Sequence, residues 1–422
     1  MRLYKCTICN EVFEQEACPA ICSVCGARED KFIEIAKVEN NFRKDTDEYI
    51  LIIGNGAAGH YAADSVRKRN KTCRITIISN ESELSYYRPV LSDLINYEVS
   101  SNFYIADKAW YEERNIFTLL DTTVEKINEK EKSVTLSTGF NLKYDKLILA
   151  TGSSNFIPPV KGHDLTNVFT LRNYKDLLEI KSNISTCKKA VIIGGGLLGL
   201  EAAWEFKEKG LEVVVVDISE NILPRQLDKD GSLVLEKYIK EAGVELKLNS
   251  FLDYIDGNDK VEKVAFKDGS TIECDIVLFS VGVRANTSIV KDSSIKIDRG
   301  VLVNKYMETT SKNIFACGDV AQLDNMSLAI WPVAVEMGKV AGANACGDYT
   351  TFKEDVYPIS LDAFNINVIS IGNINDYDEV ISEGDKKTTY KKTFIKNEKL
   401  VGAILINNSD ELVNIISKIS NK

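Results

Sequence analysis

Cysteine residues near the start of the chain are spaced as metal ligands. Two pairs, Cys6-x-x-Cys9 and Cys22-x-x-Cys25, each place two sulfur atoms on one side of a tight turn. Four thiolates can then surround one ion tetrahedrally, a geometry that suits iron or zinc, and the spacing does not distinguish these metals. Cys18 would break the symmetry of the two pairs, so we predict that it is not a ligand.

A glycine-rich segment, GNGAAG at 54–59, is the second feature that points to chemistry. It follows an apolar run at 49–53 that we expect to be a strand. Glycines at this spacing allow a tight turn, a close approach of the backbone to a pyrophosphate, and packing of a helix on the strand. The phosphate then lies at the N-terminus of that helix. A second strand is expected at 74–78, and Glu81 beyond it could bind a ribose diol.

The segment GGGLLG at 194–199 repeats this pattern about 140 residues later. An expected strand at 212–216 ends next to Asp217, which would accept hydrogen bonds from the ribose 2′-hydroxyl of NADH and repel a 2′-phosphate. Arg225 lies further on and weakens this argument, but we predict NADH rather than NADPH. Two dinucleotide sites imply two dinucleotides, and the economical pair is FAD and NADH, with hydride passing from nicotinamide to flavin.

Four motifs in order resemble one family. They are the loop at 54–59, Ala150-Thr151-Gly152 after an expected strand, GGGLLGLE at 194–201, and Cys317-Gly318-Asp319 after another strand. Over about residues 48–422 this arrangement is similar to the FAD- and NAD-dependent pyridine nucleotide oxidoreductases. The resemblance implies an α/β fold with two Rossmann-like domains for FAD and NAD(P), the second inserted into the first, followed by a small α+β C-terminal domain.

The resemblance also implies roles for individual residues. Glu201 would lie near the nicotinamide and Trp331 near the flavin, and Glu201 and Lys108 are candidates for ordering the flavin site. The alternatives are an ordinary core role for Trp331 and a solvated surface charge for Lys108. The dinucleotide contacts would come from Gly54, Gly56, Ala58, Gly59, Glu81, Arg88, Val124, Ala150, Thr151, Gly152, Gly318 and Asp319 for FAD, and from Gly194, Gly196, Gly199, Asp217, Val281 and Gly282 for NADH.

The lack of a cysteine at 82–93 and two short sequence tracts indicate which branch of the family the chain resembles. Disulfide reductases of this fold carry a redox cysteine facing the flavin, whereas the segment SELSYYRPVLSD at 82–93 has none. The remaining cysteines are isolated, so we do not expect a thiol substrate. The tracts YYRP at 86–89 and WPV at 331–333 resemble the ferredoxin, rubredoxin and nitrite reductase flavoproteins.

The cysteine-rich segment itself resembles a short rubredoxin domain, with mild departures at Asn10 and Ser23 that remove no ligand. A zinc ribbon is the alternative. The flavoprotein context favours iron, because a mononuclear iron centre carries one electron, whereas zinc has no redox chemistry.

Composition and charge limit the remaining possibilities. The chain has 52 Lys and Arg against 62 Asp and Glu, a net charge of −10, so it lacks the excess of basic residues that nucleic acids or anionic membranes attract. No apolar run reaches the roughly 20 residues of a membrane helix, and no apolar signal core is present, so we expect a cytoplasmic protein. The expected domains are 1–36 (rubredoxin-like), 37–47 (linker), 48–160 with 287–349 (FAD-binding), 161–286 (NAD-binding) and 350–422 (C-terminal).

These observations together predict a path for electrons. They would pass from NADH through FAD to an Fe(Cys)4 centre, in this chain or in an external rubredoxin, and then to a protein such as a flavodiiron protein or rubrerythrin that reduces oxygen or peroxide. The alternative is an NADH oxidase or nitrite-reductase-type flavoprotein whose N-terminal segment is a structural zinc ribbon that binds a partner. The terminal acceptor and a homodimer are left open.

Overall fold

The chain folds into two compact units, each built from separate stretches of sequence. This computed structural model describes residues 2–7, 12–20, 22, 28–35, 42–100, 103–324, 329–385 and 388–420. The first unit comprises 1–87, 100–154 and 283–354, and the second comprises 88–99, 155–282 and 355–422.

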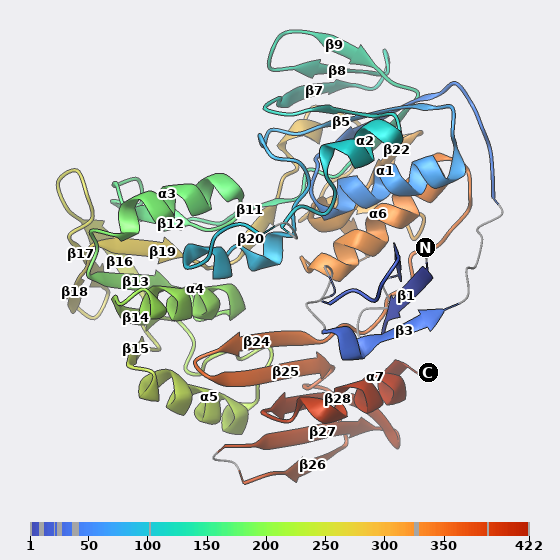
Figure 1. The fold of residues 1–422 in the computed structure, drawn as a ribbon. Helices are drawn as coiled ribbons and strands as arrows, with labels where there is room; N and C mark the ends of the chain where they lie inside the picture. Colours follow the sequence, from blue (N-terminus) through green and yellow to red (C-terminus); the bar gives the residue numbers. More distant parts are fainter. Residues whose placement is uncertain are drawn as a thin grey trace. The chain divides into compact units, whose positions relative to one another are not determined.

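A parallel five-stranded sheet forms the centre of the first unit (Figure 1). Its strands are short and rich in buried Ile and Leu, the pattern expected when helices cover a parallel sheet. Helices α1 and α6 pack closely, because a Cβ at Gly338 would lie 2.3 Å from the carbonyl oxygen of Ala58. In sheet order the strands are β22 (Ile314–Ala316), β10 (Lys146–Leu149), β4 (Tyr49–Ile53), β5 (Arg74–Ile78) and β6 (Ile116–Leu119), and the helices are α1 (Ala57–Arg69), α2 (Lys108–Glu113) and α6 (Trp331–Ala345).

Smaller sheets complete the first unit. The N-terminal segment forms a three-stranded antiparallel sheet in the order β2-β1-β3, in which Cys6 is paired with Phe32. The strands are β1 (Arg2–Cys6), β2 (Val12–Gln15), β3 (Phe32–Ile35), β7 (Val124–Asn128), β8 (Ser133–Leu136), β9 (Asn141–Lys143), β11 (Ser153–Asn155) paired with β20 (Val283–Ala285), and β21 (Val301–Val303) paired with β23 (Ala321–Leu323).

The second unit repeats the architecture of the first. Its five-stranded parallel sheet and a three-stranded antiparallel sheet share one apolar core that includes Val191, Val214, Val264 and Phe279. In sheet order the strands are β12 (Val168–Thr170), β19 (Ile276–Phe279), β13 (Lys189–Ile193), β14 (Glu212–Val216) and β15 (Val244–Lys247), with β16 (Leu252–Asp256), β17 (Lys263–Phe266) and β18 (Thr271–Glu273) in the antiparallel sheet, and helices α3 (Tyr174–Ile184), α4 (Leu197–Glu208) and α5 (Lys229–Glu241).

The C-terminal part of the second unit is an antiparallel sheet with one helix. Tyr390, fully buried, donates its hydroxyl to Asp228, the N-cap residue of α5, and so attaches this sheet to the parallel one. The order is β24 (Ile359–Ala363), β25 (Ile366–Gly372), β28 (Lys399–Ile406), β27 (Tyr390–Lys396) and β26 (Glu379–Glu383), followed by α7 (Leu412–Ser420). The expected α/β Rossmann-like fold with a C-terminal domain is confirmed.

The stretches that are grouped differently from the predicted domains include 88–99, 155–160 and 283–286. Residues 88–99 pack with the second unit although the flanking sequence belongs to the first. The Nζ of Lys181 on α3 donates to the carbonyl oxygens of Leu94 and Tyr97, at 3.1 and 3.0 Å, and this anchors the stretch. The chain crosses between units at 154/155 and 282/283, a few residues before the predicted boundaries at 160/161 and 286/287.

Part of the predicted linker is attached to the first unit. Of residues 37–47, the structure describes 42–47. The N–H of Lys44 donates to the carbonyl of Arg69 at 3.0 Å, and Asn70 donates to the hydroxyl of Thr46 at 2.9 Å. The C-terminal half of this segment therefore follows the end of α1 and does not act as a free tether.

Among the described residues, no helix is long and apolar enough to cross a membrane.

Candidate active site

The loop between β4 and α1 is shaped to admit a pyrophosphate. Gly54 has φ of +109°, and a Cβ there would lie 2.0 Å from the carbonyl oxygen of Ala150 on the neighbouring strand. A Cβ at Gly59 would lie 1.9 Å from the carbonyl oxygen of Gly54, so α1 can pack on β4 only with glycine here. Nothing approaches a Cβ at Gly56, the N-cap of α1, within 4 Å. The helix N-terminus is thus open to an anion.

A buried side-chain amide in this loop supports its assignment as a pyrophosphate-binding loop. Asn55 is only 6% exposed, and its Nδ2 finds no hydrogen-bond partner among the residues the structure describes. An unsatisfied buried donor costs about 1–3 kcal/mol. A bound phosphate would accept that hydrogen bond, so the loop fits the dinucleotide. Asn55 was not among the predicted site residues, although its position inside the glycine loop was a usable signal.

The acid predicted to bind the adenosine ribose follows β5 as expected. Glu81 accepts a hydrogen bond of 2.5 Å from the hydroxyl of Tyr86, which orients the carboxylate. Val124, predicted to line the adenine site, is the first residue of β7 and is 7% exposed. Binding of the ribose by Glu81 and of the adenine by Val124 stays a prediction.

The segments after β10 and β22 meet in the same unit as the first loop. Gly318 lies close to α1, since a Cβ there would be 2.8 Å from the Cβ of Ala58. The hydroxyl of Ser153 donates to Asp319 at 2.7 Å. Beside Ala150 and Gly152, Thr151 exchanges hydrogen bonds with Asn286, a residue that sequence reasoning missed because it lies 135 residues away.

The second glycine loop reproduces the first. Gly194 has φ of +113°, a Cβ at Gly199 would lie 2.0 Å from the carbonyl oxygen of Gly194, and Gly196 is open. Asp217 accepts hydrogen bonds of 2.7 Å from the N–H groups of Gly195 and Ser219. Its carboxylate is thereby fixed beside the loop, with lone pairs left for a ribose. The loop of the second unit therefore also fits a dinucleotide.

Glu201 lies on α4, two residues after the second loop. It accepts a hydrogen bond of 3.1 Å from the hydroxyl of Ser92, which precedes the short helix η3 (Asp93–Ile95). Burial raises the pKa of Glu201 to about 7, and the charges of Asp93 and Glu205 act in the same direction. Glu201 is therefore a carboxyl group that titrates near neutrality. Val281 and Gly282 follow β19, which lies beside β13 in the sheet of the same unit.

The other predicted residues divide between the units. Arg88 belongs to the second unit, where its guanidinium donates to the carbonyl of Arg172. Trp331 begins α6 in the first unit; its ring lies 5.2 Å from that of Tyr87, and its buried Nε1 finds no partner among the described residues. Lys108 begins α2, is 84% exposed and pairs with Glu112 at 3.3 Å.

The N-terminal segment shows half of the predicted metal ligands. Cys6 and Cys22, one from each pair, are fully buried. Cys9 and Cys25 lie outside the described residues, and within the described part of the chain no group of three or more ligand-type residues is positioned for a metal. Cys18 lies 3.9 Å from the carbonyl oxygen of Glu29.

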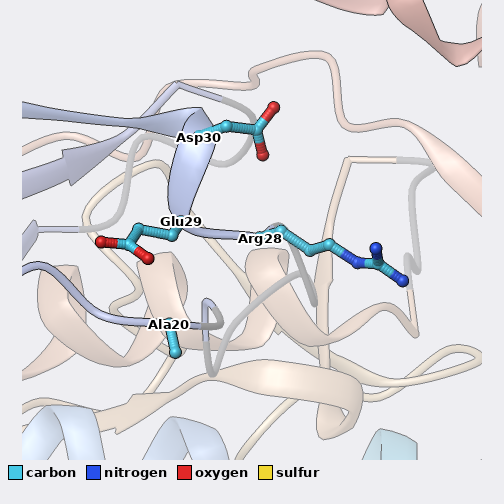
Figure 2. Close-up of a pocket in the computed structure, with 4 residues that line it drawn as sticks. All are labelled: Ala20, Arg28, Glu29 and Asp30. Carbon is cyan, nitrogen blue, oxygen red and sulfur yellow. The ribbon is translucent and has the colours of Figure 1, made fainter.

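A pocket occurs in the same segment. Ala20 lines this pocket together with Arg28, Glu29 and Asp30, and Figure 2 shows the side chains of Arg28 and Glu29 extending away from each other. This mixture of charges identifies no ligand.

Comparison with known proteins identifies the family. Residues 48–338 match the pyridine nucleotide-disulphide oxidoreductase family, and residues 359–422 match the C-terminal domain of rubredoxin NAD+ reductase. The chain belongs to the pyridine nucleotide-disulphide oxidoreductase family. It is an FAD-dependent NAD(P)H oxidoreductase of the rubredoxin reductase-like type.

The similar proteins carry names of different activities. The chain is 34% identical to an NADH-rubredoxin oxidoreductase from Clostridium acetobutylicum, over 85% of this chain and 90% of that protein. The crystal structure of that oxidoreductase matches with a TM-score of 0.74 and 33% identity, over 89% of this chain and 95% of that chain. This chain is also 34% identical to a nitrite reductase from Bacillus subtilis, over 86% of this chain. It is 35% identical to an NADH oxidase from Methanocaldococcus jannaschii, over 77% of this chain. It covers 46% of the nitrite reductase and 74% of the oxidase.

Proposed function

We propose that this enzyme transfers electrons from NADH through FAD to a rubredoxin-type iron centre held by its own N-terminal cysteines, and from there to a redox partner protein. When bound, FAD would supply two-electron chemistry toward NADH and one-electron chemistry toward ferric iron, so that one NADH would reduce the single iron centre twice, with the partner protein taking up the first electron before the second arrives. The observation that carries the proposal is that Cys6 and Cys22, one member of each CxxC pair, are both fully buried. Support also comes from the Clostridium relative, which is named for rubredoxin.

Each unit has its own task in this proposal. The first unit binds FAD at the loop of 54–59, with Asn55 and the open N-terminus of α1 donating to the pyrophosphate. The second unit binds NADH at the loop of 194–199, where Asp217 is held beside the backbone. Glu201 lies near the nicotinamide, Arg88 contacts FAD and Trp331 lies near the flavin. Glu201 and Lys108 are the candidates for ordering the flavin site. The thiolates of Cys6, Cys9, Cys22 and Cys25 hold the iron.

The attachment of residues 43–47 limits how the iron segment reaches the flavin. Asp45 accepts a hydrogen bond of 2.7 Å from the N–H of Lys71, and Arg43 donates to the carbonyl of Lys68 at 2.8 Å. Residues 43–47 are therefore held against the end of α1 and add no length to a tether. A shorter tether raises the effective concentration of the iron segment at any site it can still reach. The partner would be a second protein of the rubredoxin, flavodiiron or rubrerythrin type.

The test is an anaerobic visible spectrum before and after NADH, with metal analysis. The proposal expects flavin and ferric–thiolate bands that both bleach with NADH. Cys22→Ser should lose the iron bands and the bound metal while its flavin still bleaches. Cys18→Ser is the matched control, and it should retain both. Iron bands that persist unchanged in Cys22→Ser, or that fail to bleach in the native protein, would overturn the proposal.

The second candidate is a flavoprotein that reduces oxygen or supplies a nitrite-reducing partner, with a structural zinc ribbon at its N-terminus. The similarity to an NADH oxidase and a nitrite reductase favours it. Stoichiometric zinc together with NADH oxidation by oxygen alone would support this candidate and exclude the iron path.

A further inference from the structure

Three residues from separate segments form a buried hydrogen-bonded chain that ends at the first glycine loop. His60 on α1 is 4% exposed, and its Nδ1 lies 3.0 Å from the hydroxyl of Tyr111 on α2. That hydroxyl also donates to the Oδ1 of Asn55 at 3.4 Å. The far end of the same amide, Nδ2, is the buried donor without a partner among the described residues.

The protonation states in this chain are consistent with the observed orientation of the amide, in which Oδ1 of Asn55 faces Tyr111. Burial lowers the pKa of His60 to about 4 and raises that of Tyr111 above its ordinary value. At neutral pH the imidazole is uncharged and Tyr111 keeps its single proton. With Oδ1 of Asn55 facing Tyr111, the hydroxyl of Tyr111 donates to Asn55, and the tautomer of His60 that carries its proton on Nδ1 completes the chain by donating to the oxygen of Tyr111. The NH2 group of Asn55 is then the free end.

Aromatic packing keeps the imidazole in place. The rings of His60 and Trp110 lie 4.5 Å apart and tilted by 32°, and the ring of Tyr61 meets His60 edge-on at 5.3 Å. The guanidinium of Arg114 lies 4.6 Å from the centre of the Trp110 ring. A ring enclosed in this way has little rotational freedom, so its Nδ1 keeps its direction toward Tyr111.

We infer that His60 and Tyr111 are positioning residues that hold the amide of Asn55 with its NH2 group toward the pyrophosphate of bound FAD. The inference deepens the proposed function and rests on its FAD site. The reversed amide would place a carbonyl oxygen against a phosphate, which repels it, whereas the observed orientation lets Tyr111 donate to Oδ1 and leaves the NH2 group for the phosphate. Neither His60 nor Tyr111 touches the cofactor in this scheme; both act through Asn55.

Two substitutions at Asn55 separate this role from a structural one. Asn55→Asp keeps an oxygen that accepts from Tyr111 but replaces the NH2 group with a second oxygen. If Asn55 faces phosphate, Asn55→Asp should bind FAD more weakly than Asn55→Ala, with losses on the order of a hundredfold and tenfold. If Asn55 only satisfies Tyr111, Asn55→Asp should bind FAD better than Asn55→Ala. The readout is release of FAD from the diluted holoenzyme, followed by flavin fluorescence.

A double-mutant cycle tests whether Tyr111 acts through Asn55. Tyr111→Phe should weaken FAD binding roughly tenfold, and this loss should disappear in the Asn55→Ala background. Tyr144→Phe is the matched control, because Tyr144 is also buried in the first unit and its hydroxyl has no partner among the described residues. It should leave FAD release unchanged.

The possible failures are distinguishable. A native protein that holds no FAD at all would refute the proposed function. A native protein that holds FAD, with Tyr111→Phe and Asn55→Ala losses that simply add, would overturn the positioning role alone. Competition by ADP and by adenosine locates the effect: Asn55→Ala should weaken ADP binding and leave adenosine binding unchanged, and equal losses for both would also overturn the inference.

Discussion

The hydroxyl of Ser92 donates a hydrogen bond of 3.1 Å to Oε2 of Glu201, joining residues 109 positions apart. Ser92 is 4% exposed. The charged groups facing this pair are mostly acidic. Asp93 follows Ser92, and Glu205 lies one turn along α4. Burial, and then the charge of Asp362 on β24, raise the pKa of Asp93. The nearby cation of Lys181 is occupied by backbone carbonyls and Glu98. Glu201 is consequently easier to protonate than an ordinary glutamate.

Removing the charge of Glu201 should stabilise the protein at alkaline pH. Its folded pKa of about 7 lies above its usual value of 4.5, so the folded state binds the proton more tightly than the unfolded state. The contribution of Glu201 to the free energy of unfolding is therefore fully present below pH 4.5 and is lost as the pH rises to about 7. Glu201→Gln should raise the free energy of unfolding by about 1–3 kcal/mol at pH 8.5 and by less at pH 5.

Urea denaturation at the two pH values measures this difference. Glu208→Gln is the control, since Glu208 is an exposed carboxylate on the same helix. An equal effect of Glu201→Gln at both pH values would contradict the assigned pKa.

His60 should make the protein sensitive to acid. Its folded pKa of about 4 lies below the usual 6.5, so the unfolded chain binds a proton that the folded chain rejects. The contribution of His60 to the free energy of unfolding is fully present above pH 6.5. It falls by about 3 kcal/mol in total as the pH drops toward 4. In His60→Gln, the loss of stability between pH 7 and pH 4.5 should be smaller by a similar amount.

The other histidine of the chain provides the comparison. His163 is exposed, and His163→Gln should reproduce the native pH dependence of urea denaturation. The prediction fails if His60→Gln and His163→Gln behave alike.

The attachment of the C-terminal sheet should depend on Asp228. Burial favours the neutral acid, but hydrogen bonds from Lys392, the N–H of Gly231 and Tyr390 hold the pKa of Asp228 below its ordinary value. Stability from this group is present above about pH 4 and is lost in stronger acid. Asp228→Asn should lower the free energy of unfolding at pH 7 by about 1–3 kcal/mol.

A second lysine on the same strand serves as the control for this experiment. Lys396 pairs with Asp376 at a site where the two side chains are 35% and 63% exposed. Lys396→Met should change stability by less than about 0.5 kcal/mol. Equal losses of unfolding free energy in the two variants would show that Asp228 does not attach the C-terminal sheet more strongly than an exposed ion pair does.

Asp217 should control the choice between NADH and NADPH. Its carboxylate is held by the N–H groups of Gly195 and Ser219, so a 2′-phosphate would meet a fixed negative charge. Asp217→Asn should lower the ratio of kcat/KM for NADH over NADPH by about tenfold or more, which corresponds to about 1.4 kcal/mol. Glu220→Gln, at an exposed acid three residues on, should leave the ratio unchanged. An unchanged ratio in Asp217→Asn would exclude this role.

The local sequence was sufficient to predict the two glycine loops and the strands around them. Gly54 and Gly59 are required by contacts with their own strand, helix and nearest neighbour, so their spacing alone carries the geometry. The repeat at Gly194 and Gly199 has the same local cause. The resemblance that predicted the FAD and NAD(P) fold is confirmed by the family match.

Long-range contacts were beyond the reach of local patterns. Ser92 and Glu201 are 109 residues apart, and Thr151 and Asn286 are 135 apart. Residues 88–99 join the second unit through such contacts, although their position in the sequence assigned them to the first. Nothing in the local spacing of these residues indicates which distant side chain will complete each pair.

The sequence by itself therefore determined the α/β architecture, the two dinucleotide loops and the candidate cysteine ligands, because each follows from residues close together in the chain. Only the tertiary structure decided that Asn55 is held by Tyr111 and that Glu201 and His60 have displaced pKa values. The physical reason is that proton affinity and hydrogen-bond partners depend on burial and on charges brought together by folding.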